Sequence, residues 1–255
     1  PGNKILRNDR GLILAYDQGF EHGPTDFNDR NVDPNFILKI AKEAACYTGI
    51  VMQEGIARGY YPIGGTEKPE YPPLILKLNG KTAFHKGEEE PYSPQLCTVE
   101  KAIKLGASGV GYTIYVGSEH EAKMMQEFSK IEDEAHEAGL AVIAWMYPRG
   151  RHVEGKETTK ETVAYAARLA LELGADFVKI PYTGDVESFK WVVESAGKTG
   201  IFVQGGAKKD ESEFLKEVTE VMQTGAVGMA VGRNIWQSQD PLGMSKKVAE
   251  RIYAL

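Results

Sequence analysis

A glycine recurs along this chain at one kind of place, between a helical pattern and a run of apolar residues. Glycine adopts the left-handed conformation that other residues resist, so a glycine after an amphipathic stretch indicates the end of a helix. The apolar run that follows is then expected to be a buried parallel strand. The glycines expected to end helices are Gly49, Gly106, Gly139, Gly174, Gly200 and Gly225.

Eight short strands are predicted between these marks, and amphipathic helices fill most of the gaps. One helix start is clear, because Asp33 is a favourable N-cap and Pro34 suits the first helical position. The predicted strands are Leu12–Asp17, Ile50–Gln53, Leu74–Leu78, Gly109–Tyr115, Ala141–Tyr147, Phe177–Tyr182, Ile201–Gly205 and Val227–Gly232.

Eight strands that alternate with helices in 255 residues are typical of a (β/α)8 TIM barrel, an α/β fold. We therefore expect a single catalytic domain over residues 1–255. A doubly wound open sheet would have fewer strands and a glycine-rich first turn, which Asp17-Gln18-Gly19 does not match well. Two long loops, Pro62–Pro73 and Lys81–Thr98, follow the second and third strands, and we expect both at the C-terminal rim of the barrel.

Composition excludes some partners. The net charge is −6 and basic runs are absent, which argues against nucleic acid or an anionic membrane as a partner. Cys46 and Cys97 lie far apart without the spacing of a disulfide framework or a redox motif, which indicates a reducing compartment. Because no apolar stretch is long enough to span a membrane and no signal-peptide pattern is present, we expect a soluble, cytoplasmic protein.

One predicted strand carries a lysine in its middle. Lys179 lies on the same strand face as Phe177 and therefore points toward apolar neighbours. Burial of an ammonium group is costly, so such a lysine has a lowered pKa and becomes an amine nucleophile that can form an imine with a carbonyl. The alternative is a lysine that is paired for structural reasons, or one that extends from the strand end to water.

Active sites of such barrels lie at the C-terminal ends of the strands, so polar residues there are candidates. Asp17 ends the first predicted strand, and Tyr147 ends the fifth on the same face as Trp145. An acid, a phenol and an amine then share one rim, which favours a catalytic Lys179. Lys77, between two leucines of the third strand, is the second candidate for the nucleophile; beside an imine, its charge would lower the pKa of the other lysine.

The last two predicted strands end in glycines. Gly205 and Gly206 follow the seventh strand, and Gly232 precedes Arg233 after the eighth, where a short helix begins at Asn234. Glycine N–H groups can approach an anion closely, a helix N-terminus adds positive potential, and an arginine binds phosphate bidentately, so this pattern predicts a phosphate site. The alternative is that these glycines only make tight turns.

Six motifs carry a resemblance to a known family. They are LAYDQGFEHGP (14–24), LKLNGKT (76–82), GYTIYVGS (111–118), WMYPRG (145–150), VKIPYTGD (178–185) and AVGRNIWQ (230–237). In this order, and over nearly the whole chain, they resemble the archaeal-type class I fructose-1,6-bisphosphate aldolases. The resemblance implies a metal-independent, cofactor-free homo-oligomer that reversibly cleaves this sugar phosphate to dihydroxyacetone phosphate and glyceraldehyde 3-phosphate.

The resemblance also assigns roles to residues. It implies that Lys179 forms the imine, Tyr147 transfers protons and Asp17 assists at the substrate hydroxyls. Trp145 would shape the pocket. One phosphate would be held by Gly205, Gly206, Gly232 and Arg233, and the second phosphate or the sugar hydroxyls by His22 and Arg149. No metal is expected, and the five histidines show no short metal-ligand spacing.

The sequence departs from the family pattern at Gln204, where a small hydroxyl residue is usual, and at Ala207, where proline is common. The bulkier Gln204 puts the affinity or the position of the phosphate in doubt. The WMYPRG region also resembles archaeal synthases that perform a transaldol step in aromatic amino-acid biosynthesis, so a synthase is the main alternative. A phosphate-binding barrel without catalysis is a third hypothesis.

Overall fold

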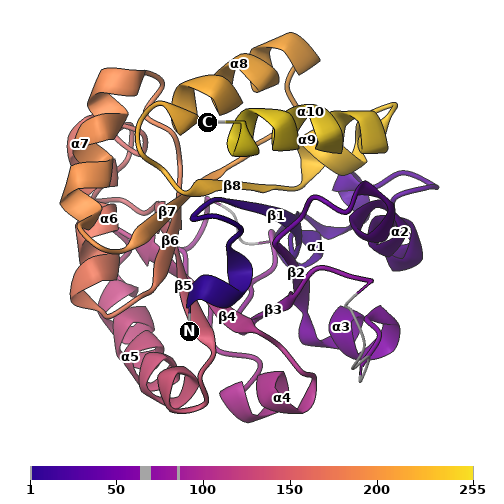
Figure 1. Ribbon diagram of the computed structural model, residues 1–255. Helices are drawn as coiled ribbons and strands as arrows, with labels where there is room; N and C mark the ends of the chain where they lie inside the picture. Colours follow the sequence, from indigo (N-terminus) through magenta and orange to yellow (C-terminus); the bar gives the residue numbers. More distant parts are fainter. Residues whose placement is uncertain (1, 64–69, 85–86, 255) are drawn as a thin grey trace.

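Eight parallel strands close into a barrel in the order of the sequence, with β8 paired back to β1 (Figure 1). The structure is a computed structural model and describes residues 2–63, 70–84 and 87–254. The predicted (β/α)8 barrel is confirmed. Its strands are β1 (Gly11–Tyr16), β2 (Gly49–Gln53), β3 (Leu74–Lys77), β4 (Gly109–Val116), β5 (Ala141–Pro148), β6 (Phe177–Ile180), β7 (Gly200–Gln204) and β8 (Gly228–Val231).

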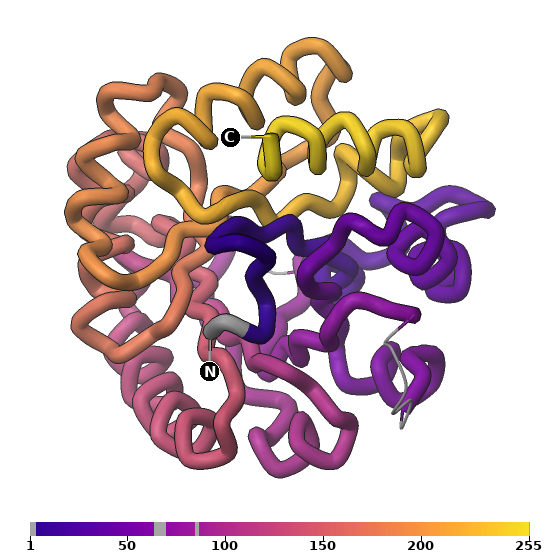
Figure 2. Tube along the Cα trace, viewed as in Figure 1, coloured from indigo at the N-terminus to yellow at the C-terminus, as the bar shows by residue number. Residues whose placement is uncertain are grey.

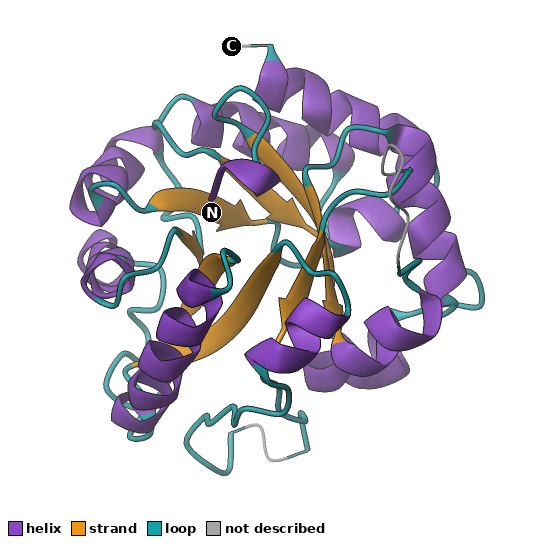
Figure 3. Ribbon diagram, turned by 60° about the horizontal axis from the view of Figure 1, so that its bottom comes forward, coloured by secondary structure: helices purple, strands orange, loops and turns teal. Residues whose placement is uncertain are grey.

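Helices surround the barrel, as Figure 3 shows. Their apolar faces lie against the outer faces of the strands, and the start of α2 is the predicted one, since the Asp33 side chain accepts from the Asn35 N–H at 2.9 Å and Pro34 takes the first position. The helices are α1 (Gly19–His22), α2 (Pro34–Ala44), α3 (Glu54–Tyr60), α4 (Val99–Lys104), α5 (Glu121–Glu137), α6 (Lys160–Glu172), α7 (Val186–Ala196), α8 (Glu211–Met222), α9 (Arg233–Trp236) and α10 (Pro241–Tyr253), with short 3₁₀ turns η1 (Gly2–Ile5) and η2 (Gly23–Asp26).

A second core fills the inside of the barrel. Inward-facing side chains from most of the strands, among them Ile13, Ile143 and Phe202, pack together there. Ile5 of η1 joins this cluster and is fully buried, so the N-terminal segment covers the end where the strands begin. The trace shows that segment in the middle of the barrel's outline (Figure 2), where η1 contacts β5. The N-terminal end of the barrel, called its floor below, is therefore filled with side chains, and only the C-terminal end is left for a site.

Four of the predicted helix-ending glycines are confirmed, since Gly106, Gly139, Gly174 and Gly225 have φ of 70, 68, 80 and 93°. The prediction was wrong for Gly49 and Gly200, which are the first residues of β2 and β7. The residues that directly follow the preceding helices are Ala45 and Gly197, with φ of 51 and 58°. At Gly49 and Gly200 a Cβ would lie 2.7 Å from a side chain of the adjacent strand, so close packing at the barrel floor is what requires glycine there.

The loop 62–73 was predicted at the wrong end of the barrel. Helix α3 lies between β2 and this loop, so the chain has already returned to the N-terminal ends of the strands. There Glu70 pairs with Lys42 of α2 at 2.7 Å; residues 64–69 lie outside the described part. The described parts of the loop 81–98 lie after β3 at the C-terminal end as predicted, with Glu90 paired to Arg151 after β5 at 3.2 Å.

Among the described residues, no helix combines the length and the apolar character needed to cross a bilayer. Both cysteines, Cys46 and Cys97, are buried and unpaired.

Candidate active site

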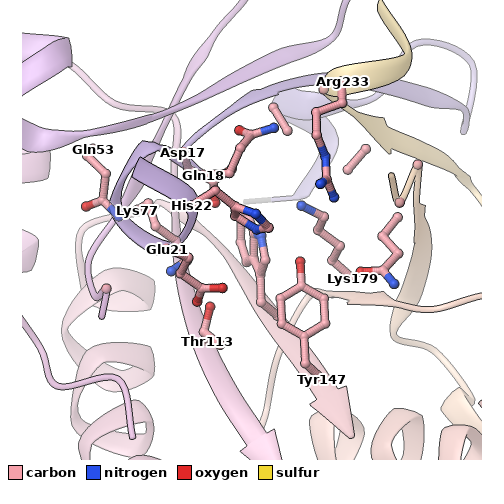
Figure 4. A pocket seen from close by; sticks show the side chains of 18 of the residues that line it. Asp17, Gln18, Glu21, His22, Gln53, Lys77, Thr113, Tyr147, Lys179 and Arg233 are labelled. Atoms are coloured by element: carbon pink, nitrogen blue, oxygen red, sulfur yellow. The ribbon is translucent and has the colours of Figure 1, made fainter. Parts of the chain in front are cut away.

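A cavity lies at the C-terminal ends of the strands and brings together all the residues that the sequence predicted for a site (Figure 4). They come from the ends of six strands and the segments that follow them. Those that line the cavity are Asp17, His22, Lys77, Trp145, Tyr147, Arg149, Lys179, Gly205, Gly206, Gly232 and Arg233. Their placement is established by the fold, while their individual roles remain predictions.

Lys179 lies on β6, in register with Trp145 of β5. Its side chain is only 6% exposed, and its Nζ lies 5.2 Å from the centre of the Trp145 ring. Burial lowers the pKa of Lys179; Asp17 and Glu21 oppose this shift, and the positive charge of Arg233 adds to it. No described residue accepts a hydrogen bond from this Nζ within the site. The amine is thus desolvated, unpaired and prone to lose its proton, as a carbonyl nucleophile requires.

Lys77 approaches the same indole ring, with its Nζ 5.9 Å from the ring centre. Unlike Lys179, it is held by two hydrogen bonds, because its Nζ donates to the backbone oxygen and to Oδ1 of Asn79, both at 2.9 Å. Burial lowers the pKa of Lys77 to about 8, Asp17 and Glu21 oppose the shift, and Lys179 adds to it. The anchored lysine suits an electrostatic role, and the unpaired Lys179 suits the nucleophile.

The indole of Trp145 lies inside the barrel, and the residue is 1% exposed. It covers Gly111 of β4, where a Cβ would lie only 2.1 Å from Cζ3 of the ring. Its Nε1–H is buried and has no acceptor among the described residues. The ring thus forms a wall of the cavity beside both lysines.

Tyr147 and Lys179 direct their polar ends into the same part of the cavity (Figure 4). Burial raises the pKa of Tyr147 well above its ordinary value, and the charges of Asp17 and Glu21 raise it further. The guanidinium of Arg149 lies 5.2 Å from the centre of the Tyr147 ring and acts in the opposite direction. At neutral pH the phenol is therefore protonated and can serve as a proton donor next to the amine.

Glu21 is a partly buried acid that was given no role from the sequence. It lies on α1, accepts a hydrogen bond from the Tyr115 hydroxyl and pairs with Arg149, whose Nη1 is 3.5 Å from Oε2. Burial by itself would raise the pKa of Glu21, but Lys77, Tyr115 and Arg149 together lower it. Its place in the LAYDQGFEHGP motif was the one available signal, since its partners belong to other strands.

Three glycines that follow β7 and β8, Gly205, Gly206 and Gly232, form another wall of the cavity, the glycine wall. Gly206 has φ of 67°, and a Cβ on Gly232 would lie 2.7 Å from the backbone oxygen of Ala15. Gln204, the departure from the family pattern, also lines the cavity. Next to this wall Arg233 lies over Asp26, with Nη1 to Oδ2 at 3.4 Å.

Asp26 is a second acid that the sequence analysis missed, and it joins two of the predicted basic groups. Its Oδ2 is 3.2 Å from Nδ1 of His22 as well as 3.4 Å from Arg233. Burial and the charge of Arg233 lower the pKa of His22, although Asp26 opposes them. Arg149 and Arg233 thus give the cavity mouth two cationic groups for phosphate, and His22, with its lowered pKa, can contribute a hydrogen bond from a neutral imidazole.

A buried unpaired lysine, a neighbouring phenol and glycine-lined strand ends with an arginine define a TIM-barrel enzyme that acts on phosphorylated carbonyl compounds through a lysine imine. Residues 11–238 match the DeoC/LacD family of aldolases. The chain belongs to this family and, within it, to the archaeal-type class I fructose-bisphosphate aldolases.

Similar proteins support this assignment. The chain is 50% identical to a class 1 fructose-bisphosphate aldolase of Thermoproteus tenax, over 98% of this chain and 92% of that one. A solved archaeal fructose-1,6-bisphosphate aldolase, whose catalytic lysine is covalently bound to the carbinolamine intermediate of the substrate, has a TM-score of 0.90 at 47% identity, over 98% and 96% of the two chains. A 2-amino-3,7-dideoxy-D-threo-hept-6-ulosonate synthase of Archaeoglobus fulgidus is less similar, at 32% identity over 96% and 86%.

Proposed function

We propose that this protein is a class I aldolase that reversibly cleaves fructose 1,6-bisphosphate to dihydroxyacetone phosphate and glyceraldehyde 3-phosphate through an imine on Lys179. The observation that carries the proposal is the desolvated amine of Lys179, which has no hydrogen-bond partner among the described residues and lies beside a phenol and an anion-binding wall. The names of the similar aldolases support the substrate. The aldolase is favoured over the related synthase because the identity is 50% rather than 32%.

The chemistry follows from the arrangement. The neutral amine of Lys179 adds to the C2 ketone, and loss of water gives a protonated imine. This cation withdraws electrons, so the C3–C4 bond breaks when the C4 hydroxyl loses its proton, and the aldehyde leaves while an enamine remains. We assign the proton transfers to Tyr147, whose phenolate the neighbouring cation stabilises, and contacts to the sugar hydroxyls to Asp17. Protonation of the enamine at C3 and hydrolysis of the imine then release dihydroxyacetone phosphate.

The geometry of the strands also suggests which phosphate lies where. Strand β6 pairs with β7, and β7 with β8, so the glycine wall adjoins Lys179. The C1 phosphate is attached to the carbon next to C2, whereas the C6 phosphate is four carbons away from C2. We therefore place the C1 phosphate at Gly205, Gly206, Gly232 and Arg233. The C6 phosphate would lie toward Arg149 and His22.

Reduction with borohydride in the presence of dihydroxyacetone phosphate tests the proposal. Hydride addition converts the imine to a stable secondary amine, and peptide mass spectrometry identifies the modified lysine. We expect the adduct on Lys179, its loss in Lys179→Met and its retention in Lys77→Met. An adduct on Lys77, or none at all, would contradict the proposal; a barrel that only binds phosphate would give no adduct.

We further propose that the protein is a cytoplasmic homo-oligomer. The family resemblance supports the oligomer, and the two buried, unpaired cysteines fit a reducing compartment. Sedimentation velocity measures the first property directly, and a monomer would contradict it.

A further inference from the structure

A buried amide lies behind the glycine wall. Asn234, the second residue of α9, is fully buried and does not itself line the cavity. Its Nδ2 donates to the backbone oxygens of Gly205 at 2.7 Å and Ala207 at 2.9 Å. Its Oδ1 accepts from the backbone N–H of Lys209 at 2.8 Å. The side chain after β8 thus binds only the backbone of the segment after β7, and it ties the two glycine-bearing strand ends together.

These bonds determine where the N–H groups of that segment point. In a trans peptide the C=O and the following N–H point in opposite directions. Because the Gly205 carbonyl faces Asn234, the N–H of Gly206 points away from Asn234; Gly206 lines the cavity and Asn234 does not, so we infer that this N–H is directed toward the cavity. Within the described residues, no acceptor binds the N–H of Gly206. It is left for a ligand.

The conformation of Gly206 agrees with an anion site. Its φ of 67° is one that a side chain would strain, although a Cβ there would meet no atom within 4 Å. Glycine is therefore required by the backbone conformation and not by crowding. Backbone N–H groups near such a left-handed residue form concave sites that bind anions.

We propose that Asn234 is a positioning residue for the phosphate next to the substrate carbonyl, because it holds the Gly205–Ala207 backbone so that the Gly206 N–H is directed at the anion. This inference rests on the proposed aldolase function. The amide is specifically suited to the task, since it donates two hydrogen bonds and accepts one. An aspartate of the same shape would keep the acceptor for Lys209 but would place carboxylate oxygen against two carbonyl oxygens.

Imine trapping with and without the phosphate group tests this role. In Asn234→Asp, the concentration of dihydroxyacetone phosphate that gives half-maximal borohydride adduct is expected to rise roughly ten- to a hundredfold, the loss typical of hydrogen bonds to a charged group. The corresponding concentration of dihydroxyacetone, which lacks the phosphate, is expected to stay unchanged. Equal changes for both ketones, or no change for either, would overturn the proposal.

The controls separate this role from a loss of structure. Asn31 is also a fully buried amide that binds backbone groups, donating to Trp236 O at 3.3 Å and accepting from Asn28 N at 2.7 Å. Asn31→Asp should leave the ratio of the two concentrations unchanged. If Asn234→Asp does not fold, Asn234→Ser, which keeps one donor, is measured with the same two outcomes. If the unmodified protein gives no adduct with dihydroxyacetone phosphate, the proposed function fails instead.

Discussion

Two lysines that look alike in sequence differ in what holds them. Lys77 is the last residue of β3 and Lys179 lies within β6, and both approach the Trp145 ring. Asn79 supplies two acceptors to Lys77, whereas Lys179 has no acceptor within the described residues. The acceptors for Lys77 come from Asn79, which follows β3. The pattern within the strands therefore could not predict which of the two amines is the nucleophile.

Lys77 should lower the stability of the protein at neutral pH. Its pKa is about 8 when folded and 10.5 ordinarily, a difference that corresponds to about 3 kcal/mol. Because the folded pKa is the lower one, the unfolded chain binds more protons between these pH values, and the free energy of unfolding rises with pH through that window. The full cost is therefore present below pH 8, and it disappears by about pH 10.5.

We accordingly expect Lys77→Met to raise the free energy of unfolding at pH 7 by about 1–3 kcal/mol, less than the full cost because two hydrogen bonds are lost. The gain should shrink at pH 10, and aldol cleavage should slow. Urea denaturation at both pH values measures this. Lys39→Met, at a largely exposed lysine, is the control and should show no such pH dependence. If the gain in free energy of unfolding over the parent were smaller at pH 7 than at pH 10, the burial of Lys77 would not be the cause.

Tyr147→Phe removes one hydroxyl and leaves the ring in place. We expect kcat to fall by about 10²–10⁴, the usual contribution of a positioned acid or base, while the Lys179 adduct still forms under borohydride. Steady-state kinetics and adduct mass spectrometry measure the two effects. Tyr165→Phe, at an exposed tyrosine of α6, should change neither. An unaltered kcat in Tyr147→Phe would exclude the phenol from proton transfer.

At the residue scale, the sequence predicted which side chains line the cavity, but it did not predict the acids that pair with them. Strand ends and face parity were enough to place Lys179, Tyr147 and Asp17 in one cavity. Glu21 and Asp26 were given no role from the sequence, because Glu21 pairs with Arg149 and Asp26 with Arg233, both of which are remote in sequence. The orientation of such acids depends on tertiary contacts that a periodic pattern does not encode.

At the scale of elements, strand β4 makes room for the indole of β5. A Cβ on Gly111 would lie 2.1 Å from the ring of Trp145, so Gly111→Ala must displace the ring or the strand. Because the ring lies beside both lysines, we expect activity to fall about a hundredfold or more, as small misplacements near the reacting atoms do. Initial rates measure this effect.

Gly59→Ala is the matched control for Gly111→Ala. Gly59 lies in α3, where a Cβ would meet no atom within 4 Å, so this variant should be fully active and up to about 1 kcal/mol more stable. Full activity in Gly111→Ala would show that the ring position is not critical.

The element predictions failed where a local rule competed with closure of the barrel. Strand positions were right to within about two residues. Gly49 and Gly200, however, do not end helices; they are glycines because side chains of the adjacent strands pack closely against them. The loop 62–73 was predicted at the wrong rim because α3, which returns the chain to the N-terminal ends of the strands, is only seven residues long and has a weak pattern in the sequence.

At the scale of the whole molecule, barrel closure joins the ends of the chain into one site. Pairing of β1 with β8 sets Asp17 beside the segment that carries Arg233, although more than 200 residues separate them. The strand count predicted this closure. The contact between Asp26 and Arg233 near this junction was not predicted from the sequence.

Cleavage should not depend on a metal ion. The imine supplies the electron sink, and no group of three or more His, Cys, Asp or Glu side chains in the described part of the chain is placed to hold an ion. We expect unchanged rates after dialysis against EDTA. A loss of activity that a divalent cation restores would contradict the imine as the sole electron sink.

The turn η1 limits the directions from which reagents can reach the Lys179 amine. With Ile5 buried across the floor and apolar side chains packed above it, small molecules can reach the Lys179 amine from one direction only. Substrate, product and any modifying reagent must share that single route. A ligand bound at the rim therefore shields the amine from all of them at once, whatever its own chemistry.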